Sequence, residues 1–261
     1  MLAPDVLVRR AATNGVDRLA LTDHDDTSGL PLARATALEV GIELVNGVEI
    51  SIEWKDTPIH IVGLAIDPDA PALKEGLAVV RGGRVERARR MSEELEKVGI
   101  HGAFEGAQRF AGNPTLISRA HFARHLVATG VCSDMHKVFE TYLVPGKPGY
   151  VDHRWATLED AVQWIKASGG IAVVAHPPRY KVSAPVLRRL FADFKDCGGR
   201  AIEVACGSHT TEQTALFGRI AQEFGFLGSR GSDFHGPDES WVDLGKAAPL
   251  PEWVTPIWSV V

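Results

Sequence analysis

Short apolar runs alternate with amphipathic stretches over the first part of the chain. Residues 16–22, 42–51 and 59–66 are rich in branched apolar side chains, which is typical of strands. The stretches 4–14 and 28–40 end at glycines, a common way to terminate a helix, and we predict helices there. The alternation of helix and strand predicts an α/β fold whose central strands are mostly parallel.

The pattern changes at Asp67-Pro68-Asp69-Ala70-Pro71, after which helical periodicity dominates up to about residue 149. The stretch 84–98 is dense in Arg and Glu, so we expect an amphipathic helix with a solvated charged face. Further helices are predicted at 117–129, 133–143, 157–168, 184–194 and 210–224, and further strands at 171–175, 201–204 and 226–229. We therefore expect a discontinuous α/β domain of residues 1–66 and 150–261, interrupted by a helical insertion of residues 67–149.

Composition narrows the classes of function. The chain has 28 Lys and Arg against 33 Asp and Glu, which gives a formal charge of −5. We therefore expect no broad basic surface for binding duplex DNA. An odd number of cysteines, three, without metal-like spacing argues against a secreted disulfide scaffold. No apolar run is long enough for a membrane span, and the first residues do not resemble a signal peptide. We expect a cytoplasmic protein without membrane contact or an obligate protein partner.

Histidine and carboxylate side chains lie near or after the ends of several predicted strands, and one histidine, His60, lies within the third. The candidates are His24, Glu49, His60, His176, Asp233 and His235. The last two are alternate residues of a segment that we expect to be extended, so their side chains would point the same way. In a parallel barrel the C-terminal ends of the strands converge on one face, where active sites form. Imidazole and carboxylate ligands without thiolate suit a divalent metal ion.

Each candidate also has an ordinary structural interpretation. His60 on an apolar strand could be a core histidine, His176 before two prolines could end a strand, and Glu203 could line the site or cap a turn. The coincidence of several such residues favours a shared metal site over independent structural roles. Four other histidines are predicted to lie on the surface, with His209 the best exception: His101, His136, His153 and His209. The six tryptophans, for example Trp155, Trp164 and Trp241, are expected to pack in the core or its rim.

These motifs resemble those of the PHP (polymerase and histidinol phosphatase) superfamily of metal-dependent phosphoesterases. The matching segments are Ala20-Leu21-Thr22-Asp23-His24-Asp25, Gly47-Val48-Glu49-Ile50-Ser51, His60-Ile61-Val62-Gly63, Ala175-His176-Pro177 and Gly231-Ser232-Asp233-Phe234-His235-Gly236. The segments Ser118-Arg119-Ala120-His121-Phe122-Ala123-Arg124, Tyr142-Leu143 and Gly146-Lys147-Pro148-Gly149-Tyr150 resemble the bacterial branch of 3′,5′-nucleoside bisphosphate phosphatases and 5′-to-3′ exoribonucleases. The resemblance implies a distorted (β/α) barrel of the PHP type, with the helical insertion over the metal face.

The resemblance also implies a role for each candidate ligand. Glu49 would bridge two metal ions, and His60 and His176 would complete the second of them. His24 and His235 would belong to a third ion and Asp233 to the first. The family pattern implies about two or three divalent ions, with manganese the first choice and iron or zinc as alternatives.

In the insertion, the resemblance gives Arg119 and His121 the roles of catalytic and substrate-binding residues that hold a phosphate, with Lys147 as a further substrate contact. Arg119 can fork onto two phosphate oxygens, which fits a substrate with more than one phosphate. The implied reaction is metal-assisted hydrolysis of phosphate from a small nucleotide, a 3′,5′-nucleoside bisphosphate or the 5′ end of a short RNA.

Two departures from the family pattern leave alternatives open. Ala120 stands where this branch is expected to carry proline. The family opens with a strand that carries a His-x-His pair, followed by an Asp in a turn, whereas this sequence begins at Met1-Leu2-Ala3-Pro4. The first strand would then be missing from the barrel, and the strand at 16–22 would have an unpaired edge. The alternatives are a phosphatase for another small phosphate ester and a catalytically weak, metal-binding form without that strand.

Overall fold

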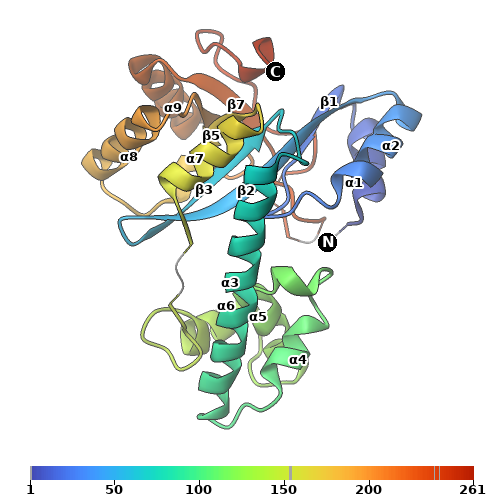
Figure 1. Cartoon of the computed structure of the whole chain (residues 1–261), viewed down its shortest axis with the longest axis vertical. Coiled ribbons are helices and arrows are strands. Elements are labelled where there is room, and N and C mark those ends of the chain that lie inside the picture. Colours follow the sequence, from blue (N-terminus) through green and yellow to red (C-terminus); the bar gives the residue numbers. More distant parts are fainter. Residues whose placement is uncertain (1, 153–154, 238, 241) are drawn as a thin grey trace. The chain divides into compact units, whose positions relative to one another are not determined.

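The structure, a computed structural model, describes residues 2–152, 155–237, 239–240 and 242–261. His153, predicted to lie on the surface, and Trp241, predicted to pack in the core or its rim, lie outside the described residues. The chain divides into two compact units, one of Met1–Gly76 and Ala156–Val261 and one of Leu77–Trp155 (Figure 1). None of the described helices combines the length and apolar character needed to cross a membrane.

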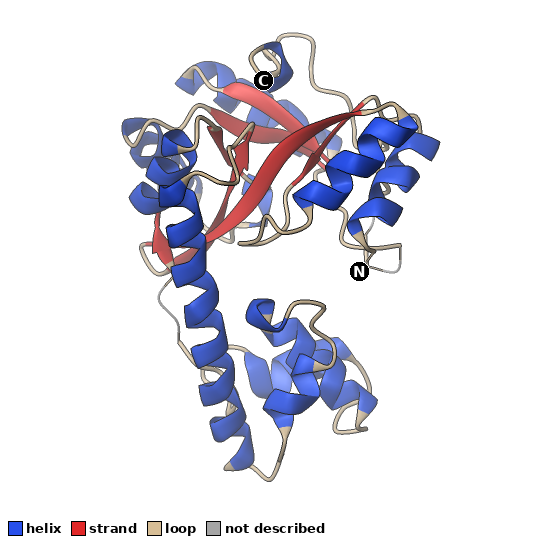
Figure 2. Cartoon of the chain, turned by 45° about the vertical axis from the view of Figure 1, so that its right-hand side comes forward, coloured by secondary structure: helices blue, strands red, loops and turns tan. Residues whose placement is uncertain are grey.

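The first unit contains a curled sheet in the strand order β1-β2-β3-β5-β6-β7, with β4 beside β2 (Figure 2). The strands are β1 (Arg18–Leu21), β2 (Glu43–Trp54), β3 (Thr57–Leu64), β4 (Ala156–Thr157), β5 (Ile171–Val174), β6 (Ala201–Cys206) and β7 (Leu227–Gly231). Among the described strands β1 pairs with β2 alone, so β1 and β7 are the two ends of the strand order. The predicted α/β fold class is therefore confirmed, as a curled sheet that forms a half-barrel.

The central strands of the sheet were predicted to be mostly parallel, and the direction of β3 differs from this prediction. β3 runs antiparallel to β2 and β5, while the other strand pairs are parallel. β2 and β3 are joined by the two-residue turn Lys55-Asp56, whose φ angles of 47° and 61° are both positive. Two central residues with positive φ are the mark of the type I′ turn that matches the twist of a hairpin. A tight hairpin can join only antiparallel strands.

Helices flank the sheet of the first unit (Figure 1). They are α1 (Pro4–Thr13), α2 (Leu30–Val40), α7 (Leu158–Ala167), α8 (Ala184–Asp196) and α9 (Thr211–Phe224), with short 3₁₀ turns at Pro177–Arg179 and Ile257–Ser259. The predicted capping box at α7 is present, because Thr157 Oγ1 accepts the Asp160 N–H at 3.1 Å and Asp160 accepts the Thr157 N–H. Gly41 ends α2 in the left-handed conformation, as its position predicted.

The second unit is helical around a separate apolar core. Its elements are α3 (Pro71–Glu96, from Leu77 onward), α4 (Ala103–Gln108), a 3₁₀ turn at Pro114–Leu116, α5 (Arg119–Ala128), α6 (Met135–Val138) and a π-helical turn at Phe139–Leu143. Met91, Leu95 and Phe122 are fully or almost fully buried in this core. The prediction that the charged face of this helix is solvated is wrong for two arginines. Arg84 is buried. Arg87 is half-buried, and its Nε donates to the Val151 carbonyl at 3.0 Å.

Candidate metal centre

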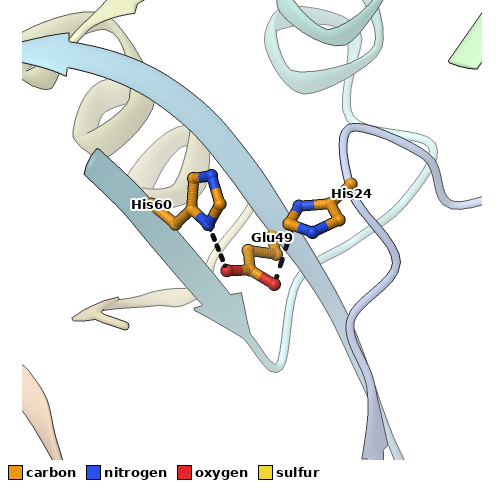
Figure 3. A group of neighbouring side chains, drawn as sticks. All are labelled: His24, Glu49 and His60. Atoms are coloured by element: carbon orange, nitrogen blue, oxygen red, sulfur yellow. Dashed lines mark ion pairs between the residues drawn. The ribbon is translucent and has the colours of Figure 1, made fainter. Parts of the chain in front are cut away.

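Glu49 is the carboxylate around which candidate ligands of the first unit gather (Figure 3). Its Oε1 lies 2.8 Å from His60 Nδ1 and 3.1 Å from His176 Nε2, and its Oε2 lies 3.7 Å from His24 Nδ1. The side chain is only 7% exposed. Glu49 lies within β2 and not near its end, because β2 continues beyond Ser51 into the hairpin.

The pairing of β2 with β3 brings His60 to Glu49. His60 is opposite Ser51 in the register, and Ser51 points to the same face of β2 as Glu49, two residues before it. His60 is therefore the diagonal neighbour of Glu49, within reach of its carboxylate. The same imidazole lies 3.2 Å, from Nδ1 to Nε2, from the ring of His176.

His24 is held in place by the backbone that follows β1. The Glu49 N–H donates to the Asp23 carbonyl at 3.1 Å, and the Asp25 N–H donates to the Glu49 carbonyl at 2.8 Å. These bonds extend the pairing of β1 with β2 past the strand end, so that His24 lies beside Glu49. Asp25 is completely buried with φ 53°, and its carboxylate accepts the Ser51 N–H at 2.7 Å. The sequence did not single out Asp25 for this positioning role.

His176 follows β5 in a rare backbone conformation, with φ 28°. Its N–H donates to Glu203 Oε2 at 2.6 Å. Glu203 therefore lines the site, which is one of the two roles that its position in the sequence allowed. The Tyr180 hydroxyl accepts the His60 N–H at 3.0 Å and donates to the Ala175 carbonyl at 2.8 Å. Tyr180 thereby joins β3 to the end of β5, a role with no signal in the sequence.

Asp233 and His235 lie close together, but not for the predicted reason. Asp233 has φ 52°, so the segment is not extended there. His235 Nδ1 lies 3.0 Å from the Asp233 carbonyl and 3.6 Å from its carboxylate, and the His235 ring is 5.8 Å from that of His24. Arg179, which the sequence analysis missed, forms an ion pair of 2.6 Å with Asp233 Oδ2.

The electrostatics of the site favour an ionised Glu49. Burial alone would raise the pKa of Glu49, but the charges of His24 and His60 and hydrogen bonds from His176 and His60 lower it well below its ordinary value. Burial likewise opposes a charge on His176, but the hydrogen bond to Glu49 and the negative charges of Glu49, Glu203 and Asp233 together outweigh it, so the pKa of His176 is raised. Burial raises the pKa of Glu203 to about 7.

The other histidines have different environments. His101 and His136 are exposed, as predicted. His209 is the half-buried exception: its Nδ1 lies 3.0 Å from the Val204 carbonyl, and burial lowers its pKa to about 4. It is therefore neutral at physiological pH.

The donor set of the first unit fits a divalent metal ion. Ligand atoms of His24, Glu49 and His60 all lie within 4.8 Å of one another, and His176 Nε2 meets the same carboxylate. Among the described residues, buried His176 Nδ1 has no hydrogen-bond partner. A buried carboxylate that gathers three imidazoles is the chemistry that borderline divalent ions prefer.

The predicted phosphate-binding residues belong to the second unit. Arg119 is the first residue of α5, half-buried, with Nη1 3.4 Å from the Leu143 carbonyl, and burial lowers its pKa. His121 is buried, and its Nδ1 accepts the Ser118 N–H at 3.1 Å, so this ring caps its own helix. Lys147 is exposed in the loop after the π-helical turn.

Comparison with known proteins gives close relatives over the whole chain. It is 51% identical over 257 residues to the 3′,5′-nucleoside bisphosphate phosphatase of Chromobacterium violaceum, covering 98% of this chain and 90% of the relative. The chain belongs to the PHP metal-dependent phosphoesterases. The 5′-3′ exoribonuclease Rnm of Escherichia coli is 45% identical over 262 residues, covering 99% of this chain and 88% of that protein. No family model matches the chain.

This PHP phosphoesterase is also similar to solved structures of related proteins. A structure from Chromobacterium violaceum, described as an amidohydrolase with bound sulfate and no metal, matches with a TM-score of 0.93 and 51% identity, covering 99% of this chain and 90% of that one. A candidate metal-dependent phosphoesterase from Bifidobacterium adolescentis matches with a TM-score of 0.79 and 28% identity, covering 100% of this chain and 89% of that one. The predicted fold family, enzyme class and metal dependence are thereby confirmed.

Proposed function

We propose that this PHP phosphoesterase hydrolyses a phosphate of 3′,5′-nucleoside bisphosphates, and that it also accepts the 5′ end of short RNA. The observation that carries the proposal is the convergence of His24, His60 and His176 on the buried carboxylate of Glu49. The substrate class is supported by the 51% identical bisphosphate phosphatase, and the RNA substrate by the 5′-3′ exoribonucleases at 43–45% identity.

In this proposal Glu49 would serve two ions, His60 and His176 would be further ligands of one of them, and His24 with His235 would hold a third. Asp233 would supply a carboxylate to the first ion. Bound divalent ions would lower the pKa of a bound water toward about 7 and offset charge on the phosphoryl oxygens. Manganese is our first choice, with iron and zinc as alternatives, because the donors are imidazole nitrogen and carboxylate oxygen.

The residues of the second unit hold the substrate in this proposal. Arg119 binds phosphate oxygens through two parallel N–H groups, and Lys147 adds an exposed positive charge. The buried ring of His121 fixes the first turn of α5, on which Arg119 stands, through its bond with Ser118. The bound sulfate in the structure of the 51% identical relative supports oxyanion binding by this architecture.

The test combines metal analysis with a substrate panel on the full chain. We expect divalent metal in protein purified without chelator, and turnover of adenosine 3′,5′-bisphosphate above that of histidinol phosphate or a sugar phosphate. His176→Ala should remove about one ion per chain and lower kcat/KM by roughly 100-fold or more. His136→Ala, an exposed histidine of the second unit, is the matched control. Unchanged metal content and turnover in His176→Ala would contradict the proposed site.

A further inference from the structure

The proposed ligands Asp233 and His235 lie on a segment without regular structure. After β7 ends at Gly231, none of the described residues between 232 and 250 belongs to a helix or a strand. Such a segment is fixed only by its contacts, whereas functional ligands must be held within about 0.5 Å of their working positions. The contacts of this segment with the rest of the first unit therefore determine where the two ligands lie.

Phe234, which stands between the two proposed ligands in the chain, attaches the segment to α1. Its half-buried ring packs against the apolar cluster that α1, β1 and α2 form together. The guanidinium carbon of Arg10, on α1, lies 5.5 Å from the centre of the Phe234 ring, which is a cation–π distance. The residue that separates Asp233 from His235 is thus held by the helix.

The same arginine holds the segment again further along the chain. Arg10 donates from Nε and from Nη2 to the two carboxylate oxygens of Asp243, each at 2.8 Å. The carbonyl of the next residue, Leu244, accepts a hydrogen bond at 3.0 Å from Nδ2 of Asn14, the residue at which α1 ends. The last turn of α1 therefore contacts the segment at two places, at Phe234 and at Asp243.

Among protein side chains, only a guanidinium can make both contacts of Arg10 at once. Its edge forms the two parallel bonds with Asp243, and its face remains available for the Phe234 ring. The side chains of Arg10 and Asp243 are 38% and 32% exposed, so water screens the pair and its contribution to overall stability is modest. The larger consequence of this geometry is a fixed position for the segment that carries the two ligands.

We propose that Arg10 is a positioning residue for the metal ions held by Asp233 and His235. Through Phe234 and Asp243 it fixes the ligand segment to α1, a helix that supplies none of the candidate ligands itself. The proposal rests on the proposed function, because that function makes Asp233 and His235 metal ligands. It gives α1 a role in metal binding that no motif in the sequence indicated.

Titration of the metal-free full chain with manganese, followed by the electron paramagnetic resonance of the free ion, measures how many ions bind and how tightly. We expect Arg10→Gln to weaken binding of the ions held by Asp233 and His235 by roughly 10–100-fold, the effect of removing groups that orient metal ligands. Arg10→Lys should weaken it to a similar extent, because an ammonium keeps the charge but not the planar fork. The matched control is Arg9→Gln, which removes an exposed arginine of the same helix and should bind manganese as the parent does.

Combined variants show which ions Arg10 acts on. Added to Asp233→Asn/His235→Ala, which lacks both ligands, Arg10→Gln should cause no further loss of affinity. Added to His176→Ala, which affects a different ion, it should cause its full loss. A merely structural role would weaken all ions equally and lower the unfolding temperature of the metal-free protein to match, and this outcome would overturn the proposal.

The same measurements separate this proposal from the proposed function. If Asp233→Asn/His235→Ala binds manganese as the parent does, the two residues are not ligands, and the proposed metal site fails together with the positioning role. If that variant loses ions while Arg10→Gln and Arg10→Lys bind as the parent does, the positioning role alone is overturned. Binding like the parent's in Arg10→Lys alone would overturn the role of the fork, since a positive charge would then be sufficient.

Discussion

At the scale of single residues, the candidate ligands could be found from the sequence and the groups that hold them could not. His24, Glu49, His60 and His176 stood out because imidazole and carboxylate recur after predicted strands, and the structure brings all four together. Asp25, Tyr180 and Glu203 act on backbone atoms of their neighbours. The sequence alone does not show which side chain will accept a hydrogen bond from a particular backbone N–H. The Asp233 segment was misjudged because a positive φ cannot be recognised in a non-glycine residue from sequence.

The bond from His176 N–H to Glu203 can be tested by two substitutions. Glu203→Leu leaves a buried N–H without an acceptor, so we expect a loss of about 1–3 kcal/mol in the free energy of unfolding. Because His176 is thereby released, metal affinity should fall by roughly 10–100-fold. Glu203→Gln keeps an oxygen acceptor and should retain most of both. Urea unfolding and metal titration give the two readouts, and an unaltered metal affinity in Glu203→Leu would refute the positioning role.

At the scale of elements, the sequence indicated the helices with clear ends and missed features that depend on packing. The Thr157 capping box and the terminating Gly41 are local signals, and both were predicted correctly. The hairpin turn was missed because Lys55-Asp56 lacks the asparagine or glycine that usually marks a type I′ turn. The arginines of α3 were assigned to solvent because their burial depends on Trp155, which is distant in sequence.

Two glycines of α3 should respond in opposite ways to alanine. A Cβ at Gly76 would lie 2.3 Å from Trp164 Cδ2, so Gly76→Ala forces the indole ring to move and should cost about 1–3 kcal/mol. A Cβ at Gly82 would meet nothing within 4 Å, so Gly82→Ala should gain up to about 1 kcal/mol from helix propensity. Urea unfolding of both variants measures the difference. Destabilisation by both to the same extent would show that the close approach of Trp164 is not the cause.

The pair of Arg10 and Asp243 ties α1 to the segment that follows β7, and its contribution should depend on pH. Arg10 donates from Nε and Nη2 to the two carboxylate oxygens, each at 2.8 Å, and this bond lowers the pKa of Asp243 to about 2. A lowered pKa stabilises the fold above the ordinary aspartate value of about 3.9, and this stabilisation is lost as the pH falls toward 2. Asp243→Asn should therefore flatten the fall of the unfolding temperature between about pH 4 and pH 2. The exposed Asp17→Asn is the control, and identical pH profiles of parent and Asp243→Asn would rule out the contribution.

At the scale of the whole molecule, the two proposed binding functions are built into different units. The candidate metal ligands all belong to the unit of Met1–Gly76 and Ala156–Val261, and the proposed phosphate-binding residues Arg119 and Lys147 belong to Leu77–Trp155. The sequence predicted the metal candidates on strands and the loops that follow them, and Arg119 and His121 on a helix, and the structure has them on these kinds of element.

This separation predicts that the two ligands protect different parts of the chain from hydrogen exchange. Manganese added to metal-free protein should slow amide exchange in β2 and β3, because Glu49 and His60 lie on these strands. Inorganic phosphate should slow exchange in the first turn of α5, which carries Arg119. His176→Ala should abolish the first effect alone, and Arg119→Gln the second alone. Equal protection of both units by manganese, or phosphate protection that survives Arg119→Gln, would contradict separate sites, since each ligand can stabilise only the groups whose free energy it changes.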